Sequence, residues 1–277
     1  MNISIITATY NAASTVTDCL QSVASQTHPA EQIIIDGAST DGTLDIVSRL
    51  TASNASCLTN LISEKDQGIY DAMNKGIALA NGEVVGILNA DDFYASPDVL
   101  EKVARAFEDP AVMCCYGDLE YVREAGLSFK DQGLSIEGKT IPCSLTLHPS
   151  PFTVTRYWKS GPFSPDSFYR GWMPPHPTFF VRRSVYERCG IFRLDMGSAA
   201  DYELMLRFLV RHGLRTVYIP EVLVRMRVGG ASNESLAARL RANRMDRRAW
   251  EVNGLRPYPW TIMMKPLRKV GQYFVRR

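Results

Sequence analysis

The sequence has no pair of cysteines at CxxC spacing and no apolar run near the roughly 20 residues that a membrane-spanning helix needs. We therefore expect neither a cysteine-based zinc site nor a conventional transmembrane helix. The phosphate-binding patterns GxxxxGK[ST] and GxGxxG are also missing, which excludes a P-loop and a dinucleotide fingerprint. Six cysteines scattered over 277 residues predict reduced, mostly buried thiols in the cytoplasm. Met1–Ile6 has no basic stretch before its apolar residues and is interpreted as a strand instead of a signal peptide.

Charge is distributed unevenly along the chain, although the formal net charge is only +2. From Arg239 onward there are eleven Arg and Lys residues against Asp246 and Glu251, so this tail carries +9 and the remainder −7. A basic tail on an acidic body indicates an anionic partner, which charge alone cannot identify as membrane or nucleic acid. No nucleic-acid-binding motif accompanies the charges, so we expect no nucleic acid partner.

Strand-like and helix-like segments alternate through the first half of the chain. Apolar, strand-like segments occupy residues 3–7, 32–35, 58–62 and 84–88, and segments with helical apolar spacing occupy 13–25, 41–50 and 68–80. This alternation predicts an α/β fold with a mostly parallel sheet and helices on both faces. Residues 120–172 are less regular and are expected to hold long loops. A helix near 201–212, strands near 215–218 and 222–227, and two basic helices around a proline-containing break should follow.

Polar residues follow the predicted strands, at the sheet edge where open α/β sheets bind their ligands. These residues are Thr7, Thr9, Tyr10, Asp36, Asp91 and Asp92. For any single one, a helix cap or a turn is as good an explanation as a function, since Asp-Gly is a common turn. Adjacent carboxylates are costly unless a cation or solvent separates their charges, and oxygen ligands suit Mg²⁺ or Mn²⁺. The acid pair therefore predicts a divalent metal, with a solvated turn as the alternative.

Four segments occur in an order that resembles the family 2 glycosyltransferases, especially those of bacterial exopolysaccharide and colanic-acid-type pathways. They are Thr9-Tyr10-Asn11, Asp36–Thr43, Glu64 through Asp71–Gly76, and Leu88–Asp92. The resemblance covers residues 1–230 and implies a GT-A fold, a nucleotide diphosphate-sugar donor, Mn²⁺ or Mg²⁺, and inversion at the anomeric carbon. We expect residues 1–119 to bind the donor, 120–230 to bind the acceptor, and 231–277 to form a basic helical extension.

The resemblance also assigns roles to residues of the predicted donor site. Thr7, Thr9 and Tyr10 would line the nucleotide site, Asp36 would accept a hydrogen bond from the base, and Lys75 is a further donor-binding candidate. The DxD motif of the family falls on Asn89-Ala90-Asp91, so its first acid is replaced by an amide. Asn89 can still hydrogen-bond ribose. Asp91 becomes the better metal ligand and Asp92 the second candidate.

Three later residues are candidates for catalysis and for binding. Asp201, in Ala200–Glu203, matches the position of the catalytic base, with Tyr202 where a neighbouring acid is usual; a plain helix N-cap is the alternative. His176 is a candidate contact to acceptor or phosphate, or a structural histidine. Arg227 belongs to the basic, glycine-containing segment 225–233, which we expect to be either a flexible loop closing over a diphosphate or a surface turn.

The tail has apolar residues near helical spacing, with basic residues between and after them. The apolar residues are Trp260, Met263, Met264, Leu267, Val270 and Phe274, and the basic ones are Lys265, Arg268, Lys269, Arg276 and Arg277. Such a helix either lies in an anionic membrane interface or packs on the domain.

The predicted function is inverting transfer from a nucleotide diphosphate-sugar, with UDP-sugar favoured, to a saccharide or lipid-linked saccharide. The reaction would take place in the cytoplasm, on the inner face of the cell membrane. The alternatives are a sugar nucleotidyltransferase and a nucleotide-sugar-binding module that has lost catalysis, which Asn89 and Tyr202 make conceivable.

Overall fold

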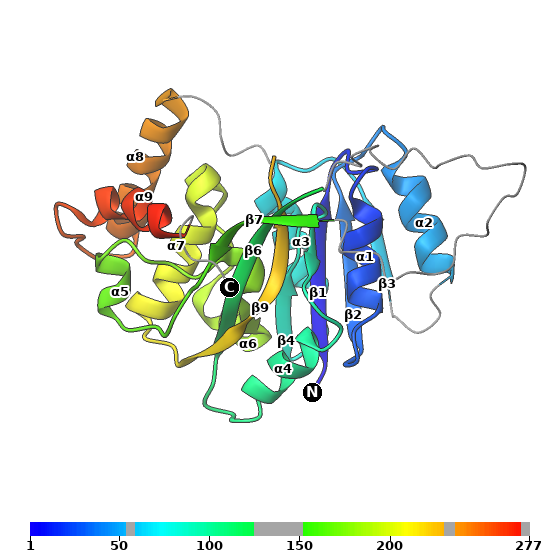
Figure 1. The fold of residues 1–277 in the computed structure, drawn as a ribbon, viewed down its shortest axis with the longest axis horizontal. Coiled ribbons are helices and arrows are strands. Elements are labelled where there is room, and N and C mark those ends of the chain that lie inside the picture. Colours follow the sequence, from blue (N-terminus) through cyan, green and yellow to red (C-terminus); the bar gives the residue numbers. More distant parts are fainter. Residues whose placement is uncertain (54–58, 125–151, 230–235, 273–277) are drawn as a thin grey trace, which may run out of the picture.

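The computed structural model describes residues 1–53, 59–124, 152–229 and 236–272. Within these ranges one nine-stranded sheet runs through the molecule in the order β3-β2-β1-β4-β8-β6-β9-β5, and β7 pairs with β6 beside this path (Figure 1). Helices lie on both faces of the sheet. The predicted α/β architecture is therefore confirmed.

The first half of the chain forms the parallel part of the sheet. Its elements are β1 (Ile3–Thr9), α1 (Val16–Ala24), β2 (Ala30–Asp36), α2 (Thr43–Ser53), β3 (Thr59–Ser63), α3 (Ile69–Leu79) and β4 (Val84–Ile87). Strand β1 pairs in parallel with β2 and β4, and β2 with β3. Runs of buried isoleucine and valine explain these strands, because helices cover both faces of a parallel sheet. Each predicted strand and helix of this half is present within a few residues of its expected bounds.

The second half adds a mixed part to the same sheet. Its elements are β5 (Asp92–Tyr94), α4 (Val99–Ala106), β6 (Cys114–Glu124), β7 (Phe152–Trp158), α5 (Asp166–Tyr169), the 3₁₀ helix η1 (His176–Thr178), β8 (Phe180–Arg182), α6 (Arg183–Cys189), the 3₁₀ helix η2 (Leu194–Ala199), α7 (Ala200–Leu206), the π-helix η3 (Arg207–Arg211) and β9 (Thr216–Arg227). Strands β6 and β9 are parallel, whereas β4–β8, β6–β8, β6–β7 and β5–β9 are antiparallel. The two strands expected at 215–218 and 222–227 form the single strand β9.

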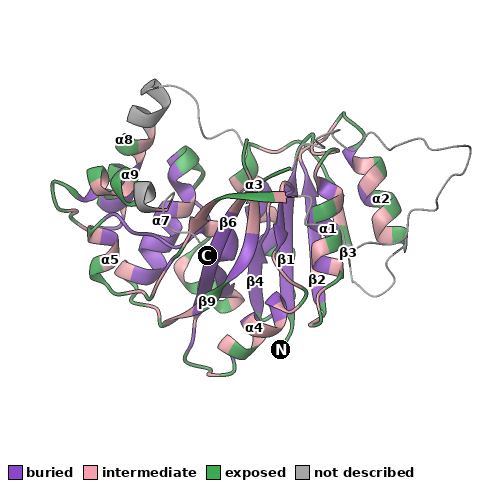
Figure 2. Cartoon of the chain, in the orientation of Figure 1, coloured by how far each residue is buried: buried purple, intermediate pink, exposed green. Residues whose placement is uncertain are grey.

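Close packing of α3 on β1 fixes the sheet edge that carries the predicted donor site. A Cβ atom on Gly76 of α3 would lie 2.3 Å from Cγ2 of Ile6, so only glycine allows this approach. Figure 2 shows the central strands as the buried layer, and their carboxyl ends lie at the upper edge in this view. Helix α3 thereby brings its own N-terminal turn to the same edge.

The C-terminal helices α8 (Leu236–Val252) and α9 (Thr261–Gly271) lie against α7 and α5 (Figure 1). The fully buried Trp250 donates its indole N–H to the Tyr202 hydroxyl at 2.9 Å. Lys265 of α9 pairs with Asp246 of α8 at 2.8 Å, and its ammonium lies 3.8 Å from the centre of the Tyr202 ring. In the ranges that the structure describes, no helix is long and apolar enough to cross a membrane.

Candidate functional site

Asp36 lies fully buried at the end of β2 and holds the turn that follows it. Its carboxylate accepts hydrogen bonds from the Ser39 N–H at 2.9 Å, from the Ser39 hydroxyl, and from the Ser63 hydroxyl at 2.7 Å. Within this turn Ala38 has a positive φ of 62°, a conformation that non-glycine residues adopt only when held there. The contacts of Asp36 in this structure thus stabilise the turn, and its predicted hydrogen bond to a base stays a prediction.

The end of β1 and the residue after it supply two buried candidates and one exposed candidate. Thr7 is fully buried and faces the thiol of Cys19 on α1, with 3.9 Å between oxygen and sulfur. The Thr9 hydroxyl is buried and has no hydrogen-bond partner among the described residues. Tyr10 is 66% exposed. Since an unpaired buried hydroxyl carries a desolvation cost, Thr9 and the neighbouring Tyr10 are the residues of this strand best placed to meet a ligand.

Asp66 is a residue of this edge that the sequence analysis did not single out. One of its carboxylate oxygens lies 2.7 Å from the place that a Cβ on Gly37 would occupy, and the Tyr10 ring lies 3.3 Å from the same place. The other oxygen accepts the Gly68 N–H at 2.9 Å. The missing side chain of Gly37 therefore lets Asp66 and Tyr10 approach the turn after β2. The available signal was its position between Glu64 and Asp71 in the third motif.

Lys75 of α3 is engaged by neighbouring acids. Its ammonium lies 2.7 Å from Glu64 and 3.6 Å from Asp71, and it donates to the Lys65 carbonyl at 3.2 Å. The hydrogen bond with Glu64 is the main cause that raises the pKa of Lys75. These contacts tie α3 to the end of β3, and donor binding by Lys75 stays a prediction.

The adjacent acids Asp91 and Asp92 have opposite environments. Asp92 is fully buried at the start of β5, where one carboxylate oxygen accepts the Asn89 amide at 3.2 Å. Burial, followed by the charge of Asp91, raises the pKa of Asp92 well above its usual range. Asp91 is partly exposed, and its carboxylate has no hydrogen bond or ion pair with the described part of the chain. Of the two acids, Asp91 is therefore the one whose carboxylate is available to bind a ligand or a metal ion.

Asp91 and its surroundings fit a metal ion that is completed by substrate. No group of three His, Cys, Asp or Glu side chains suited to a metal occurs within the ranges described. Mg²⁺ and similar hard cations are commonly held by one or two carboxylates plus substrate phosphates. The second oxygen of Asp92 and the amide oxygen of Asn89 are buried without a hydrogen-bond partner. This oxygen-rich corner suits Mn²⁺ or Mg²⁺, and the role of Asp91 as a metal ligand stays a prediction.

Arg227 lies beside this corner, in strand β9. It donates to the Asp91 carbonyl at 3.0 Å, pairs with Asp18, and sits 5.1 Å from the ring centres of both Phe93 and Phe152. The expectation of a flexible loop from residue 225 is wrong for residues 225–227, because backbone pairing with β5 and β6 holds them in the sheet. Residues 230–233 lie outside the described residues. Contact of Arg227 with a diphosphate stays a prediction.

Asp201 occupies the first turn of α7, behind a backbone kink at Gly197. The N-cap is Ala199 and has no side-chain cap, so the alternative of Asp201 as the N-cap is wrong. One carboxylate oxygen of Asp201 accepts the Tyr202 N–H at 2.7 Å. Tyr202, in the place of the usual second acid, is buried and bonded to Trp250.

Two side chains from distant parts of the sequence lie near Asp201. Burial lowers the pKa of His176, and the charge of Asp201 opposes this shift. Burial raises the pKa of the Tyr70 hydroxyl of α3, and the charge of Asp201 raises it further. His176 was predicted as a site residue, whereas Tyr70 was not, because its spacing on α3 is that of an ordinary helix residue.

The model of the family "Glycosyl transferase family 2" matches residues 4–187, which is more than half of the chain. The chain belongs to this family. The PGL/p-HBAD biosynthesis glycosyltransferases of Mycobacterium bovis and Mycobacterium tuberculosis are 29% identical over 232 residues, which cover 83% of this chain and 78% of theirs. An uncharacterized glycosyltransferase of Nostoc sp. is 36% identical over 114 residues, 41% of this chain and 35% of its own.

Solved structures confirm the predicted GT-A fold. Staphylococcus aureus TarS superposes with a TM-score of 0.63 at 18% identity, over 99% of this chain and 44% of TarS. The mannosyltransferase PcManGT from Pyrobaculum calidifontis, solved with GDP-Man and Mn²⁺, has a TM-score of 0.60 at 20% identity, over 98% of this chain and 69% of its own. At these identities the likeness establishes the fold alone.

Proposed function

We propose that the protein is an inverting glycosyltransferase that uses a UDP-sugar and a saccharide or lipid-linked saccharide acceptor. The observation that supports this best is that the Asp201 carboxylate is not paired with a cation among the described residues. The carboxylate lies in the first turn of α7 and makes no ion pair within the described part of the chain. A carboxylate that no cation neutralises can accept a proton, which is the property that a general base needs.

In the proposed reaction Asp201 takes the proton of the acceptor hydroxyl. The hydroxyl oxygen forms a bond to the anomeric carbon while the bond from that carbon to the diphosphate oxygen breaks. The electron pair of the broken bond leaves with the nucleotide diphosphate. Attack opposite the leaving group inverts the configuration in one step. Thr9, Tyr10 and Asn89 at the carboxyl edge of the sheet would hold the donor, with Asp36 and Thr7 supporting their loops from beneath.

Asp91 would hold Mn²⁺ or Mg²⁺ together with the donor diphosphate. When bound, the metal would offset the charge that develops on the departing diphosphate. Asp92 is a weaker ligand candidate because burial favours its neutral form. The Mn²⁺ in the structure of the related fold PcManGT is consistent with this assignment.

A UDP-sugar is the favoured donor. Structures of TarS with UDP and with UDP-GlcNAc have the same fold as this chain, although PcManGT carries GDP-Man. Asp66 offers one carboxylate oxygen beside the exposed ring of Tyr10, since its other oxygen is occupied by Gly68. A single acceptor matches the single ring N–H of uracil better than the adjacent donors of guanine.

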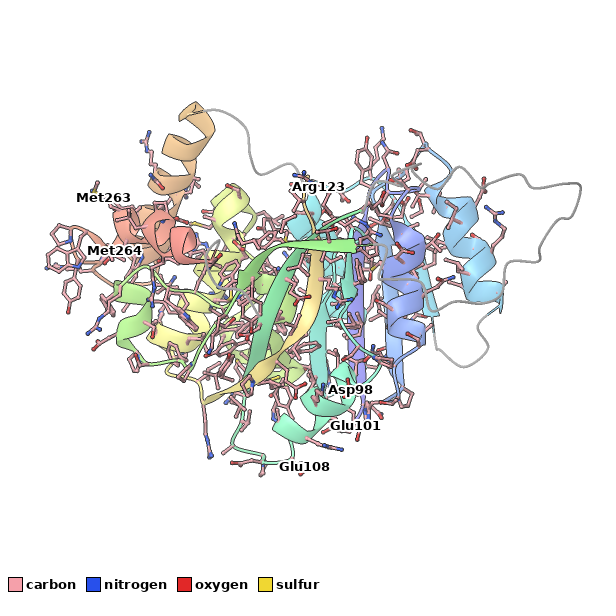
Figure 3. All side chains as sticks on the ribbon, viewed as in Figure 1. Asp98, Glu101, Glu108, Arg123, Met263 and Met264 are labelled. Carbon is pink, nitrogen blue, oxygen red and sulfur yellow. The ribbon has the colours of Figure 1, made fainter. Side chains whose placement is uncertain are left out.

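We also propose that the enzyme works on the inner face of the cell membrane, held by the outward side of α9. Trp260, Met263 and Leu267 are 55%, 71% and 61% exposed, and Figure 3 shows Met263 on the outer side of this helix. Lys265 contributes no charge to this contact, because it is paired with Asp246. Arg268 is exposed and available.

A donor screen tests the proposed activity. Thermal unfolding is followed with UDP-, GDP- and dTDP-sugars, each with and without Mn²⁺, and release of nucleotide diphosphate is then measured. We expect a metal-dependent shift with UDP-sugars and release of UDP. Release of pyrophosphate from a nucleoside triphosphate and sugar phosphate would instead identify a nucleotidyltransferase. Binding of donor without any release, with acceptors supplied, would identify a binding module.

A further inference from the structure

Asp91 lies in a tight turn between β4 and β5. The Asp92 N–H donates to the Asn89 carbonyl at 3.0 Å, which closes the turn over residues 89–92. The Asp91 carboxylate itself makes no hydrogen bond or ion pair with the described residues. The direction of this carboxylate is therefore set by the backbone of Asp91, and a contact that fixes the backbone also fixes where the side chain points.

The side chain of Arg227 holds this turn from strand β9. Met226 lies opposite Asp92 in the antiparallel pairing of β9 with β5, so the next residue, Arg227, lies beside Asp91. Its nitrogen Nη1 donates to the Asp91 carbonyl at 3.0 Å, and its nitrogen Nη2 pairs with the carboxylate of Asp18 on α1. The planar guanidinium thus joins the turn to α1 in one fixed geometry.

The guanidinium of Arg227 is enclosed by aromatic and acidic side chains. Its central carbon lies 5.1 Å from the ring centres of both Phe93 and Phe152, and these two centres are 4.8 Å apart. The third nitrogen, Nε, is 3.8 Å from the Glu124 carboxylate, and only 11% of the side chain is exposed. Little of the guanidinium is left for a diphosphate, whereas its contact with Asp91 is already made.

Asp18 balances the charge of Arg227 beside the proposed metal ion. Arginine stays protonated in proteins, so its charge alone would repel a divalent cation held by Asp91. The carboxylate of Asp18, which is 48% exposed, pairs with this charge. The pair therefore supports Asp91 without adding a net charge to the corner.

We infer that Arg227 is a positioning residue, which holds the backbone of Asp91 so that its carboxylate faces the metal ion, while Asp18 holds Arg227. This role rests on the proposed function, in which Asp91 binds Mn²⁺ or Mg²⁺ together with the donor diphosphate. Arg227 touches neither the metal ion nor the donor and acts only through Asp91. Its contribution should therefore appear in metal-dependent binding and be absent from binding without metal.

Calorimetric titration of the full-length protein with UDP, with and without Mn²⁺, tests this dependence. The quantity compared is the factor by which Mn²⁺ strengthens UDP binding. Arg227→Met keeps an apolar stem beside Phe93 and Phe152 and removes the hydrogen-bonding nitrogens. It should lower the factor roughly tenfold, as expected for one hydrogen bond from a charged group, and leave the affinity without Mn²⁺ unchanged. Arg227→Lys keeps the charge without the planar fork and should lose nearly as much.

Three further proteins sharpen the measurement. Arg225→Lys is the matched control for Arg227→Lys, because Arg225 lies on the same strand but pairs with Glu120 at 3.1 Å, and it should leave the factor unchanged. Asp18→Asn leaves Arg227 in place, removes the charge of its partner, and should lower the factor several-fold. In the Asp91→Asn background, Arg227→Met should cause no further loss.

The outcomes separate this inference from the proposed function. An equal loss of UDP affinity with and without Mn²⁺ would show that Arg227 contacts the diphosphate and would overturn the positioning role. An unchanged factor in Arg227→Met, a factor fully retained in Arg227→Lys, or an undiminished loss in the Asp91→Asn background would also overturn it. If Arg227→Met does not fold, an unchanged factor in Asp18→Asn has the same meaning. If Mn²⁺ does not strengthen UDP binding to the wild type, the metal assignment of the proposed function fails, and the positioning role fails with it.

Discussion

The donor edge of the sheet and the surroundings of Asp201 are built in different ways. At the donor edge, polar residues from the first 92 positions follow the parallel strands β1, β2 and β4. Most of these polar residues make contacts within the loops or are buried. Asp36 accepts three hydrogen bonds and Asp92 is buried. Around α7, the side chains of Tyr70 and His176, from two distant segments, lie near the carboxylate of Asp201, which pairs with no cation in the described part of the chain. Sequence motifs at the donor edge therefore report the architecture of loops as much as contacts to a ligand.

The largest expected effect is on the Asp201 side. Asp201→Asn should lower kcat by ~10²–10⁴-fold, the usual contribution of a general base. Donor binding should stay nearly intact, because the substitution keeps the shape of the side chain and Asp201 is proposed to act on the acceptor hydroxyl. Steady-state release of nucleotide diphosphate and calorimetric titration with UDP measure the two effects. Unchanged turnover in a folded variant would leave Asp201 with a structural role only.

At the donor edge, the two neighbouring acids should respond differently. Asp91→Asn should weaken Mn²⁺-dependent binding of UDP by roughly tenfold or more, because it removes a charge that is free to face the metal. Asp92→Asn should have a much smaller effect, because burial already favours the neutral form of Asp92. Calorimetry with UDP, with and without Mn²⁺, compares the two variants. Equal affinity in wild type and Asp91→Asn would contradict the metal assignment.

The comparison also shows how far the sequence could predict the structure. Apolar periodicity placed the elements of the first half within a few residues, because parallel strands buried on both faces have an unambiguous pattern. It did not predict β7 or β8, which are short or partly exposed and pair with strands far away in the sequence. For residues 225–227 the strand expected at 222–227 is confirmed, and the competing expectation of a loop from residue 225 is wrong, because these residues pair with β5 and β6.

The same limit applies to the candidate site. Thr9, Tyr10 and Asp91 lie at the ends of adjacent strands, so a local pattern was enough to bring them together. Asp66 lies inside the third motif, but its approach to the turn after β2 depends on the absence of a side chain at Gly37. Tyr70 was not singled out, because only the folded chain brings it near the charge of Asp201.

A smaller effect is expected on folding stability when the pH is lowered, because His176 then takes up a proton. Burial holds its folded pKa below the unfolded value near 6.5, so the unfolded chain binds the proton first. The stability from neutral His176 is fully present above about pH 6.5 and is lost as pH falls toward the folded pKa. One such group changes the free energy of unfolding by at most about 1.4 kcal/mol per pH unit. Urea unfolding from pH 7.5 downward should show a shallower slope for His176→Gln than for wild type. His212, whose pKa is also lowered, remains in both proteins, and identical slopes would contradict the assignment to His176.

The smallest expected effect is on membrane binding. It is tested by comparing substitutions on the outward side of α9 with substitutions elsewhere on the surface. Replacing Trp260, Met263 and Leu267 by serine should reduce pelleting with phosphatidylglycerol-containing vesicles several-fold, because these exposed side chains supply the apolar part of the contact. The vesicle binding that remains in the triple variant should be strongly reduced by salt. Only the basic side chains then hold the protein on the membrane, and salt screens their charges. Val154→Ser with Leu79→Ser removes exposed apolar side chains elsewhere and serves as the control. Val154 and Leu79 are 48% and 36% exposed, and the three side chains of the triple variant are more exposed still. Neither the control nor the triple variant should therefore lose its fold. If the triple variant and the control pellet equally, the outward side of α9 does not contact membranes, and α9 serves only to pack on α5, α7 and α8.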